Sequence, residues 1–183
     1  CDPALLRCPE IFTVRDPGGA IASRQQYHKR LLQLFEKCCR SKNTGAQAVL
    51  QKYIPAIELM EACVTSRLNA HSDDYAYRTI LCKLANSVHF DTPLVDFAIR
   101  PQKTTWNFLN VLINDIDHAA RAETTGDSDP EHHEYAHDAA VPCVRSFLDN
   151  VYGEDRVELI EDCATKRSMM VNTCFTLASD HML

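Results

Sequence analysis

Two histidines and a glutamate stand at a spacing that can hold and use a metal ion. The segment His133-Glu134-Tyr135-Ala136-His137 has the pattern H-E-x-x-H. Residues four apart share one face of an α-helix, so both imidazoles could bind one zinc ion. Glu134 could then act as general base on a zinc-bound water. The spacing therefore indicates a candidate hydrolytic site with zinc as its cofactor.

This pattern resembles the motif of the zincin metallopeptidases, whose zinc takes a third protein ligand. Asp149 begins the run Asp149-Asn150-Val151-Tyr152-Gly153, which resembles the D-x-x-Y-G tail of the aspzincin motif, without the Gly-Thr pair that precedes it there. This resemblance offers Asp149 as the third ligand, and Glu154, Glu158 or Glu161 is the alternative if the third ligand is a glutamate. Zincins also align their substrate along a strand edge, and this sequence predicts no strand. We therefore favour a polar helix start as the interpretation of the motif.

The cysteines are the second set of residues with chemistry of their own. They form no C-x-x-C pair and have no zinc-finger spacing to histidine, so disulfides are their expected role. Cys38 and Cys39 would point about 100° apart on a helix and so reach different partners. The sequence has nine cysteines, so pairing within the chain leaves one over. We assign this unpaired cysteine to Cys1 or Cys8, either as a free thiol or as the link between two chains in a covalent homodimer. The disulfide candidates are Cys1, Cys8, Cys38, Cys39, Cys63, Cys82, Cys143, Cys163 and Cys174.

The start of the chain and its cysteine content together predict a location. The chain begins with Cys1 rather than methionine, and we interpret it as a mature product whose signal peptide has been removed. Many cysteines suit an oxidising compartment, so we expect a secreted, extracellular protein. No apolar run reaches the roughly 18–20 residues that a membrane span needs.

The charge of the chain bears on its partners. The net charge of −6 argues against a nucleic-acid partner. Residues 24–52 hold seven Lys and Arg against one acid, whereas residues 127–163 hold eleven Asp and Glu against two Arg. Two solvated faces explain this pattern most simply, and a bipolar surface that steers a charged partner is the alternative.

The elements that must position these residues are predicted to be helices, because apolar residues recur at helical spacing and none alternate as in a strand. The first helix runs from about Ala20, and Asp129-Pro130 begins a later one that should break or kink near Pro142. The apolar stripe of the first helix consists of Tyr27, Leu31, Leu34, Phe35 and Cys38. We predict an all-α fold: an irregular, disulfide-cross-linked bundle of six to seven helices without a sheet. It forms a single domain, 1–183, with an irregular N-terminal arm, 1–19, and an exposed loop, 121–128.

These features favour a secreted, disulfide-stabilised interaction protein without catalytic activity, acting as a ligand, receptor-binding or recognition factor. A first alternative is a carrier that holds a small apolar ligand between its helices. The wall candidates for such a pocket are Met60, Phe97, Trp106, Phe108, Met169 and Met170. The second alternative is a zinc-dependent peptidase that uses His133, Glu134 and His137.

Overall fold

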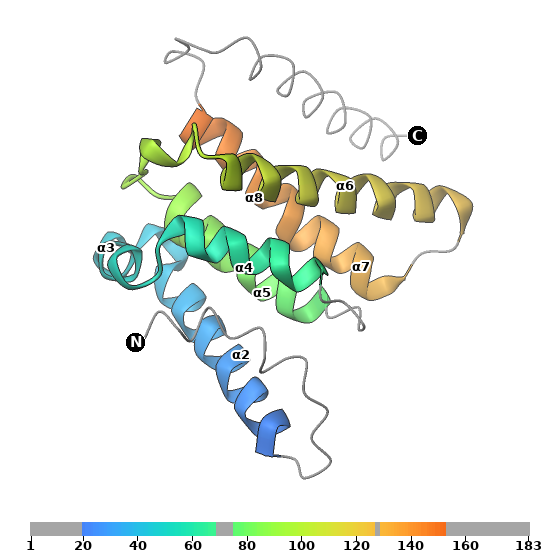
Figure 1. Cartoon of the computed structure of the whole chain (residues 1–183), viewed down its shortest axis with the longest axis horizontal. Coiled ribbons are helices and arrows are strands. Elements are labelled where there is room, and N and C mark those ends of the chain that lie inside the picture. The colour runs from blue at the N-terminus through green and yellow to red at the C-terminus, as the bar shows by residue number, and fades with distance from the viewer. Residues whose placement is uncertain (1–19, 69–74, 127–128, 153–183) are drawn as a thin grey trace.

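The computed structural model describes residues 20–68, 75–126 and 129–152, and within these ranges the chain is helical with no strand (Figure 1). The predicted all-α class is confirmed. The α-helices are α2 (Ala20–Cys39), α3 (Thr44–Tyr53), α4 (Ala56–Leu68), α5 (Tyr75–Ala85), α6 (Lys103–Thr125), α7 (Pro130–Tyr135) and α8 (Val141–Ser146). The 3-10 turns are η2 (Arg40–Lys42) and η4 (Phe97–Ile99), and the π-helical turns are η3 (Asn86–Phe90), η5 (Ala136–Ala140) and η6 (Phe147–Tyr152). The predicted arm, 1–19, lies outside the described residues.

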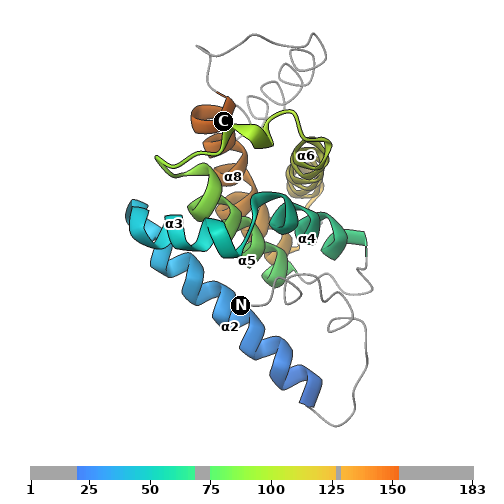
Figure 2. The same cartoon turned by 60° about the vertical axis from the view of Figure 1, so that its left-hand side comes forward.

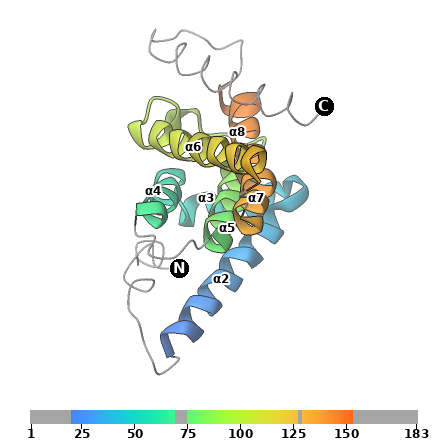
Figure 3. The same ribbon diagram turned by 90° about the vertical axis from the view of Figure 1, so that its right-hand side faces the viewer.

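The helices stack in layers around α5. Helices α2 and α6 lie on opposite sides of the layer formed by α4 and α5 (Figures 1, 2 and 3). The N-terminal end of α2 projects away from the other helices. The segment from α7 to η6 packs against both α5 and α6. None of the described helices combines the length and the apolar character needed to cross a membrane.

Aromatic side chains fill the core where α6, η3 and η6 meet. Phe90 and Phe147 are fully buried, with ring centroids 5.6 Å apart in an edge-to-face arrangement. Trp106 meets Phe147 in the same geometry at 6.2 Å. Such pairs add to the free energy gained from burying their large apolar surface. They fix the segment after α8 against the start of α6.

Residues 130–152 form one continuous helical rod. Asp129 begins it as predicted, because its carboxylate accepts a hydrogen bond from Glu131 N–H at 3.0 Å and Pro130 occupies the first turn. Near Pro142 the sequence predicts a break or kink, and the structure instead has the π-helical turn η5. Val141 N–H bonds to the carbonyl of Ala136, five residues earlier, immediately before Pro142, which lacks a donor.

The apolar stripe predicted for α2 is confirmed only in part: Leu31 and Phe35 are half-buried, and Phe35 packs against the core, but the other three residues are exposed. Tyr27 is 69% exposed and Leu34 55%, and Cys38 is also exposed. The buried side chains of α2 include Leu32 and Cys39. The helix carries apolar residues on two faces, and contact with α5 selects the face that the periodicity did not favour.

The predicted loop 121–128 is also wrong over most of its length. Helix α6 continues to Thr125, and Gly126 ends it in the left-handed conformation, with φ 74°. Arg121, Ala122 and Glu123 are good helix formers, and glycine adopts positive φ without a steric penalty, so the sequence does support the longer helix. This added turn carries Glu123, which becomes part of the candidate site.

Candidate metal centre

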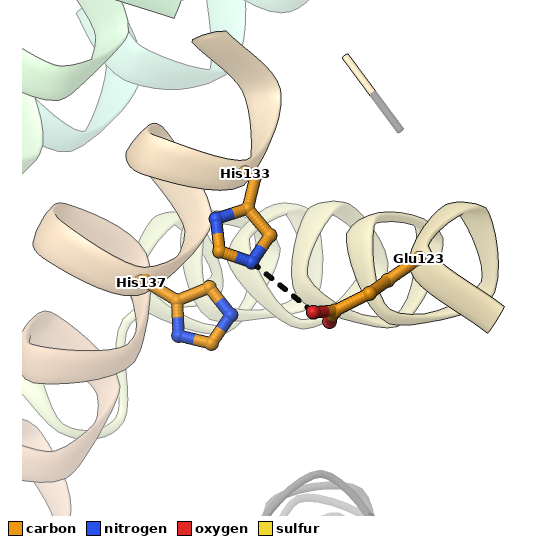
Figure 4. Close-up of side chains that lie close together, drawn as sticks. All are labelled: Glu123, His133 and His137. Atoms are coloured by element: carbon orange, nitrogen blue, oxygen red, sulfur yellow. Dashed lines mark ion pairs between the residues drawn. The ribbon is translucent and has the colours of Figure 1, made fainter. Parts of the chain in front are cut away.

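The end of α6 and the start of α7 bring three metal-ligand side chains together. Glu123 lies on the last turn of α6, and His133 and His137 lie on the rod that begins soon after Gly126. Because α6 and α7 are in contact, Glu123 points across the hairpin toward both imidazoles (Figure 4). We call Glu123, His133 and His137 the metal centre.

The ligand atoms of the metal centre lie near one another. His133 Nε2 lies 3.6 Å from Glu123 Oε1, and the rings of His133 and His137 stack with centroids 4.2 Å apart. One ligand atom from each residue lies within 4.8 Å of the other two. Ligands of tetrahedral zinc at about 2.1 Å are about 3.4 Å apart, so small side-chain rotations would close the set.

The metal centre is open to solvent on one side. The Glu123 side chain is 44% exposed and that of His133 39%. Two imidazoles and one carboxylate leave a coordination position for water or another ligand. The arrangement can therefore bind an exchangeable ion.

A buried anchor sets the direction in which the two histidines face. Tyr135, which lies between them in the sequence, is 1% exposed, and its hydroxyl donates to Asp115 Oδ2 at 3.0 Å. Arg78 Nη1 donates to the same oxygen at 3.2 Å. With Tyr135 held in the core, helix geometry turns His133 and His137 outward.

Glu134 faces a different part of the molecule. It lines a hollow of about 400 Å³ together with residues of α2 and α5, and it is not a member of the group that can hold a metal. The hollow also contains the charged side chains Lys37, Arg40 and Lys83. The zincin arrangement requires this glutamate beside the zinc-bound water. The structure instead places Glu134 in a hollow lined by charged side chains.

The third ligand implied by the zincin resemblance lies elsewhere on the rod. Asp149 pairs with Arg145 at 3.5 Å, and its side chain is 63% exposed. The structure brings Glu123 to the two histidines, a residue that the sequence analysis did not name. The signal that could have identified it was the helix-forming run before Gly126, because a longer α6 places Glu123 opposite the next helix.

A second pair of imidazoles lies beside the metal centre, with one ring buried and the other, that of His118, exposed. His132 is 4% exposed, and its Nδ1 lies 3.4 Å from Nδ1 of His118. Burial lowers the pKa of His132, and the neighbouring His118 lowers it further. Tyr75 stacks on His132 with ring centroids 4.6 Å apart. The stacking of Tyr75 and the contact with His118 hold the His132 ring in this position.

The described cysteines occupy different environments. Cys38 is exposed and Cys39 is buried, as expected if adjacent side chains diverge, and burial raises the pKa of Cys39 to about 11. Three more, Cys63, Cys82 and Cys143, are buried, and all five are free thiols here. The remaining candidates, Cys1, Cys8, Cys163 and Cys174, lie outside the described residues, so the predicted disulfides stay a prediction.

The described wall candidates of the carrier hypothesis are not among the residues that line the two hollows described here. Met60 and Phe108 are fully buried in the packed core, and Trp106 is 8% exposed. Phe97 is 37% exposed on η4, and Met169 and Met170 lie outside the described residues. Two hollows among the described residues are lined mainly by polar and charged side chains.

Comparisons with models of protein families, with curated proteins and with solved structures found no match. The function must therefore be argued from the side chains and their geometry.

Proposed function

We propose that this chain is a helical metal-binding protein that binds a divalent transition-metal ion, zinc, at its metal centre. The observation that carries the proposal is the approach of three ligand atoms from two helices to within 4.8 Å of one another. The protein acts by binding rather than by peptide hydrolysis, because Glu134 faces the hollow beside α2 and α5.

The ligand types favour zinc over the harder divalent cations. Imidazole nitrogen with one carboxylate suits zinc and its neighbours in the first transition row. Calcium and magnesium prefer oxygen ligands and, for magnesium, retained waters. The bound ion would join the last turn of α6 to the first turns of the rod, and would keep one position for water or for a ligand from a partner.

Metal titration of the full chain tests this proposal. We expect one zinc ion per metal-free chain, with an affinity at least about tenfold weaker in Glu123→Gln and in His137→Asn, since even indirect partners of a metal contribute that much. Asp149→Asn is the matched control, because it removes the carboxylate implied by the zincin resemblance, and it should bind zinc normally. Equal affinity in Glu123→Gln and the parent chain would contradict the assignment.

A separate comparison distinguishes binding from catalysis. Glu134→Gln should leave zinc affinity unchanged, and neither the zinc-loaded parent chain nor the variant should cleave a library of unstructured peptides. Zinc-dependent cleavage by the parent chain that is lost in Glu134→Gln would instead establish the peptidase.

A second candidate function uses the exposed face of α2 and keeps the proposal of an extracellular interaction protein. This face exposes three apolar side chains to solvent at helical spacing: Tyr27, Leu34 and Cys38. Exposed Arg30 and Lys37 lie on the same helix, and residues 24–52 are strongly basic. We propose an acidic amphipathic protein segment as the partner, since it would cover the apolar side chains and meet the basic ones.

The partner proposal can be tested by one matched pair of variants. Binding of a partner captured from extracellular fluid should be saturable and should be lost in Leu34→Asp. Val49→Asp changes a side chain on α3 that is 54% exposed, and should leave binding intact. Equal loss in both variants would exclude a specific site on α2.

A further inference from the structure

The hollow that Glu134 lines lies between α2 and α7, and α5 forms its floor. Both α2 and α7 pack against α5. The floor residues, Ala76, Thr79, Ile80 and Lys83, are spaced three and four apart and so share one face of α5. The volume of about 400 Å³ is typical of small-ligand sites, which measure about 300–1,000 Å³. We call this space the α5 hollow.

The two sides of the α5 hollow carry opposite charges. Lys37 on α2 and Lys83 on α5 present ammonium groups, and Glu131 and Glu134 on α7 present carboxylates. Within the part of the chain that the structure describes, no ion pair joins these ammonium groups to these carboxylates. The charges on both sides are therefore available to a ligand.

The other two charges of the hollow neutralise each other. Arg40 Nε donates to Glu36 Oε1 at 2.6 Å, and Glu36 is buried. The ammonium groups and carboxylates that remain balance, so the hollow has no excess charge to favour an anion or a cation alone. A zwitterion with its charges at opposite ends matches this arrangement, because each end then meets the opposite sign.

The floor between the two charged sides suits the middle of a short peptide. Ala76 and Ile80 offer apolar contact, and the Thr79 hydroxyl and the Gln33 amide can form hydrogen bonds with peptide groups. A single amino acid carries both of its charges on one carbon atom. A short peptide separates them by its own length, so it can meet both sides of the hollow.

We propose that the α5 hollow binds a short peptide through its free amino and carboxyl ends. The carboxylate of the peptide lies at Lys37 and Lys83, and its ammonium group lies at Glu131 and Glu134. Binding is noncovalent and requires no metal. The site is separate from the metal centre, to which neither glutamate belongs, and it goes beyond the proposed function.

NMR titration of the isotope-labelled, metal-free full chain tests this proposal, with trialanine as the probe. We expect saturable chemical-shift changes at residues of the α5 hollow. N-acetyl-trialanine and trialaninamide should each bind about fivefold more weakly, because each lacks one charge. Alanine should also bind more weakly than trialanine. Absence of saturable binding, or equal affinity of trialanine and either capped peptide or alanine, would overturn the proposal.

Paired variants identify which end of the peptide meets which side of the hollow. Lys83→Gln should weaken trialanine about fivefold and leave trialaninamide unchanged, because the amide has no carboxylate to lose a partner. Glu134→Gln should weaken trialanine and leave N-acetyl-trialanine unchanged. Lys52→Gln on α3 and Glu61→Gln on α4 are matched controls that change exposed charges outside the hollow, and both should bind normally. Equal weakening of trialanine and trialaninamide by Lys83→Gln would contradict the assigned contacts.

One further variant separates this proposal from metal binding. Glu123→Gln removes a ligand of the metal centre and should leave trialanine binding unchanged. Normal peptide binding by a chain that fails to bind zinc would refute the proposed function alone. Loss of trialanine binding in Glu123→Gln, or binding only after zinc is added, would overturn the α5 hollow as the peptide site.

Discussion

The buried Cys143 and the metal centre lie on different sides of the same helical rod, and both consist of residue types that commonly bind metals. Cys143 faces the core and is fully buried, whereas His133 and His137 face outward beside Glu123. Burial keeps the thiols neutral, because a thiolate would lose its hydration. The exposed imidazoles and carboxylate keep access to water and ions. The face of the helix, more than the type of residue, therefore decides which cluster can exchange a ligand.

Thiol labelling should show the largest difference between a buried and an exposed sulfur. In the reduced, folded chain we expect a maleimide to modify Cys38 about a thousandfold faster than Cys63 or Cys82, because the buried thiols react only after unfolding. Mass spectrometry of tryptic peptides measures the rates. Denaturant should remove the difference, and comparable rates without denaturant would mean that the core is open.

Removal of Asp115, whose carboxylate accepts the hydrogen bond from the Tyr135 hydroxyl, should have the next largest effect. Asp115→Ala leaves Arg78 buried without its partner, so we expect the free energy of unfolding to fall by about 3–5 kcal/mol. Asp117 on the same helix pairs with Arg121 at the surface, at 2.8 Å. Asp117→Ala should cost less than about 1 kcal/mol in urea unfolding. Similar losses in the two variants would contradict the role given to the buried pair.

Acid should reveal the contrast between buried and exposed imidazoles. Burial lowers the pKa of His89 from 6.5 to about 4, and its Nε2 lies 2.9 Å from the carbonyl of Ile54. Because the unfolded chain binds this proton more readily, the free energy of unfolding should fall as the pH falls from 6.5 to about 4. For this one group the loss is about 3 kcal/mol.

Urea unfolding at a series of pH values measures that slope. His89→Gln retains an amide donor toward Ile54 but cannot titrate, so its unfolding free energy should change less between neutral and acidic pH. An unchanged slope in His89→Gln would assign the acid sensitivity to other groups, such as the buried His28 and His132, whose pKa values burial also lowers.

Zinc should stabilise the folded chain by a smaller amount that depends on the outward-facing cluster. At a free concentration one hundred times the dissociation constant, we expect about 2.7 kcal/mol of added unfolding free energy. Glu123→Gln at the same zinc concentration should gain much less, while Cys143→Ala should gain as much as the parent chain. Loss of the zinc effect in Cys143→Ala would instead place the ion at the buried cysteines Cys63, Cys82 and Cys143.

Local rules predicted the features that depend on neighbours in sequence. The helical class, the start of the rod at Asp129-Pro130 and the shared face of His133 and His137 all follow from spacing and capping. The third ligand, Glu123, was missed because the Gly126 region was interpreted as one loop. Its polar residues outweighed the helix formers before it in that interpretation.

Contacts between distant segments set the features that could not be predicted. The amphipathic pattern of α2 offers two apolar faces, and packing against α5, α3 and η3 leaves Leu32 buried while Leu34 is exposed. The network of Arg78, Asp115 and Tyr135 joins three helices, and no spacing within one segment shows it.

The wide turn η5 has a consequence for how the rod tolerates changes in length. A π-helical turn is in effect an α-helix that has accepted one additional residue. Deletion of Ala139 or Ala140 would return this stretch to ordinary helix while the ends of the rod keep their facing directions. The rod could therefore lose one residue between His137 and Cys143 and keep the faces on which both residues lie. In an ordinary α-helix the same deletion would rotate one end relative to the other by about 100°.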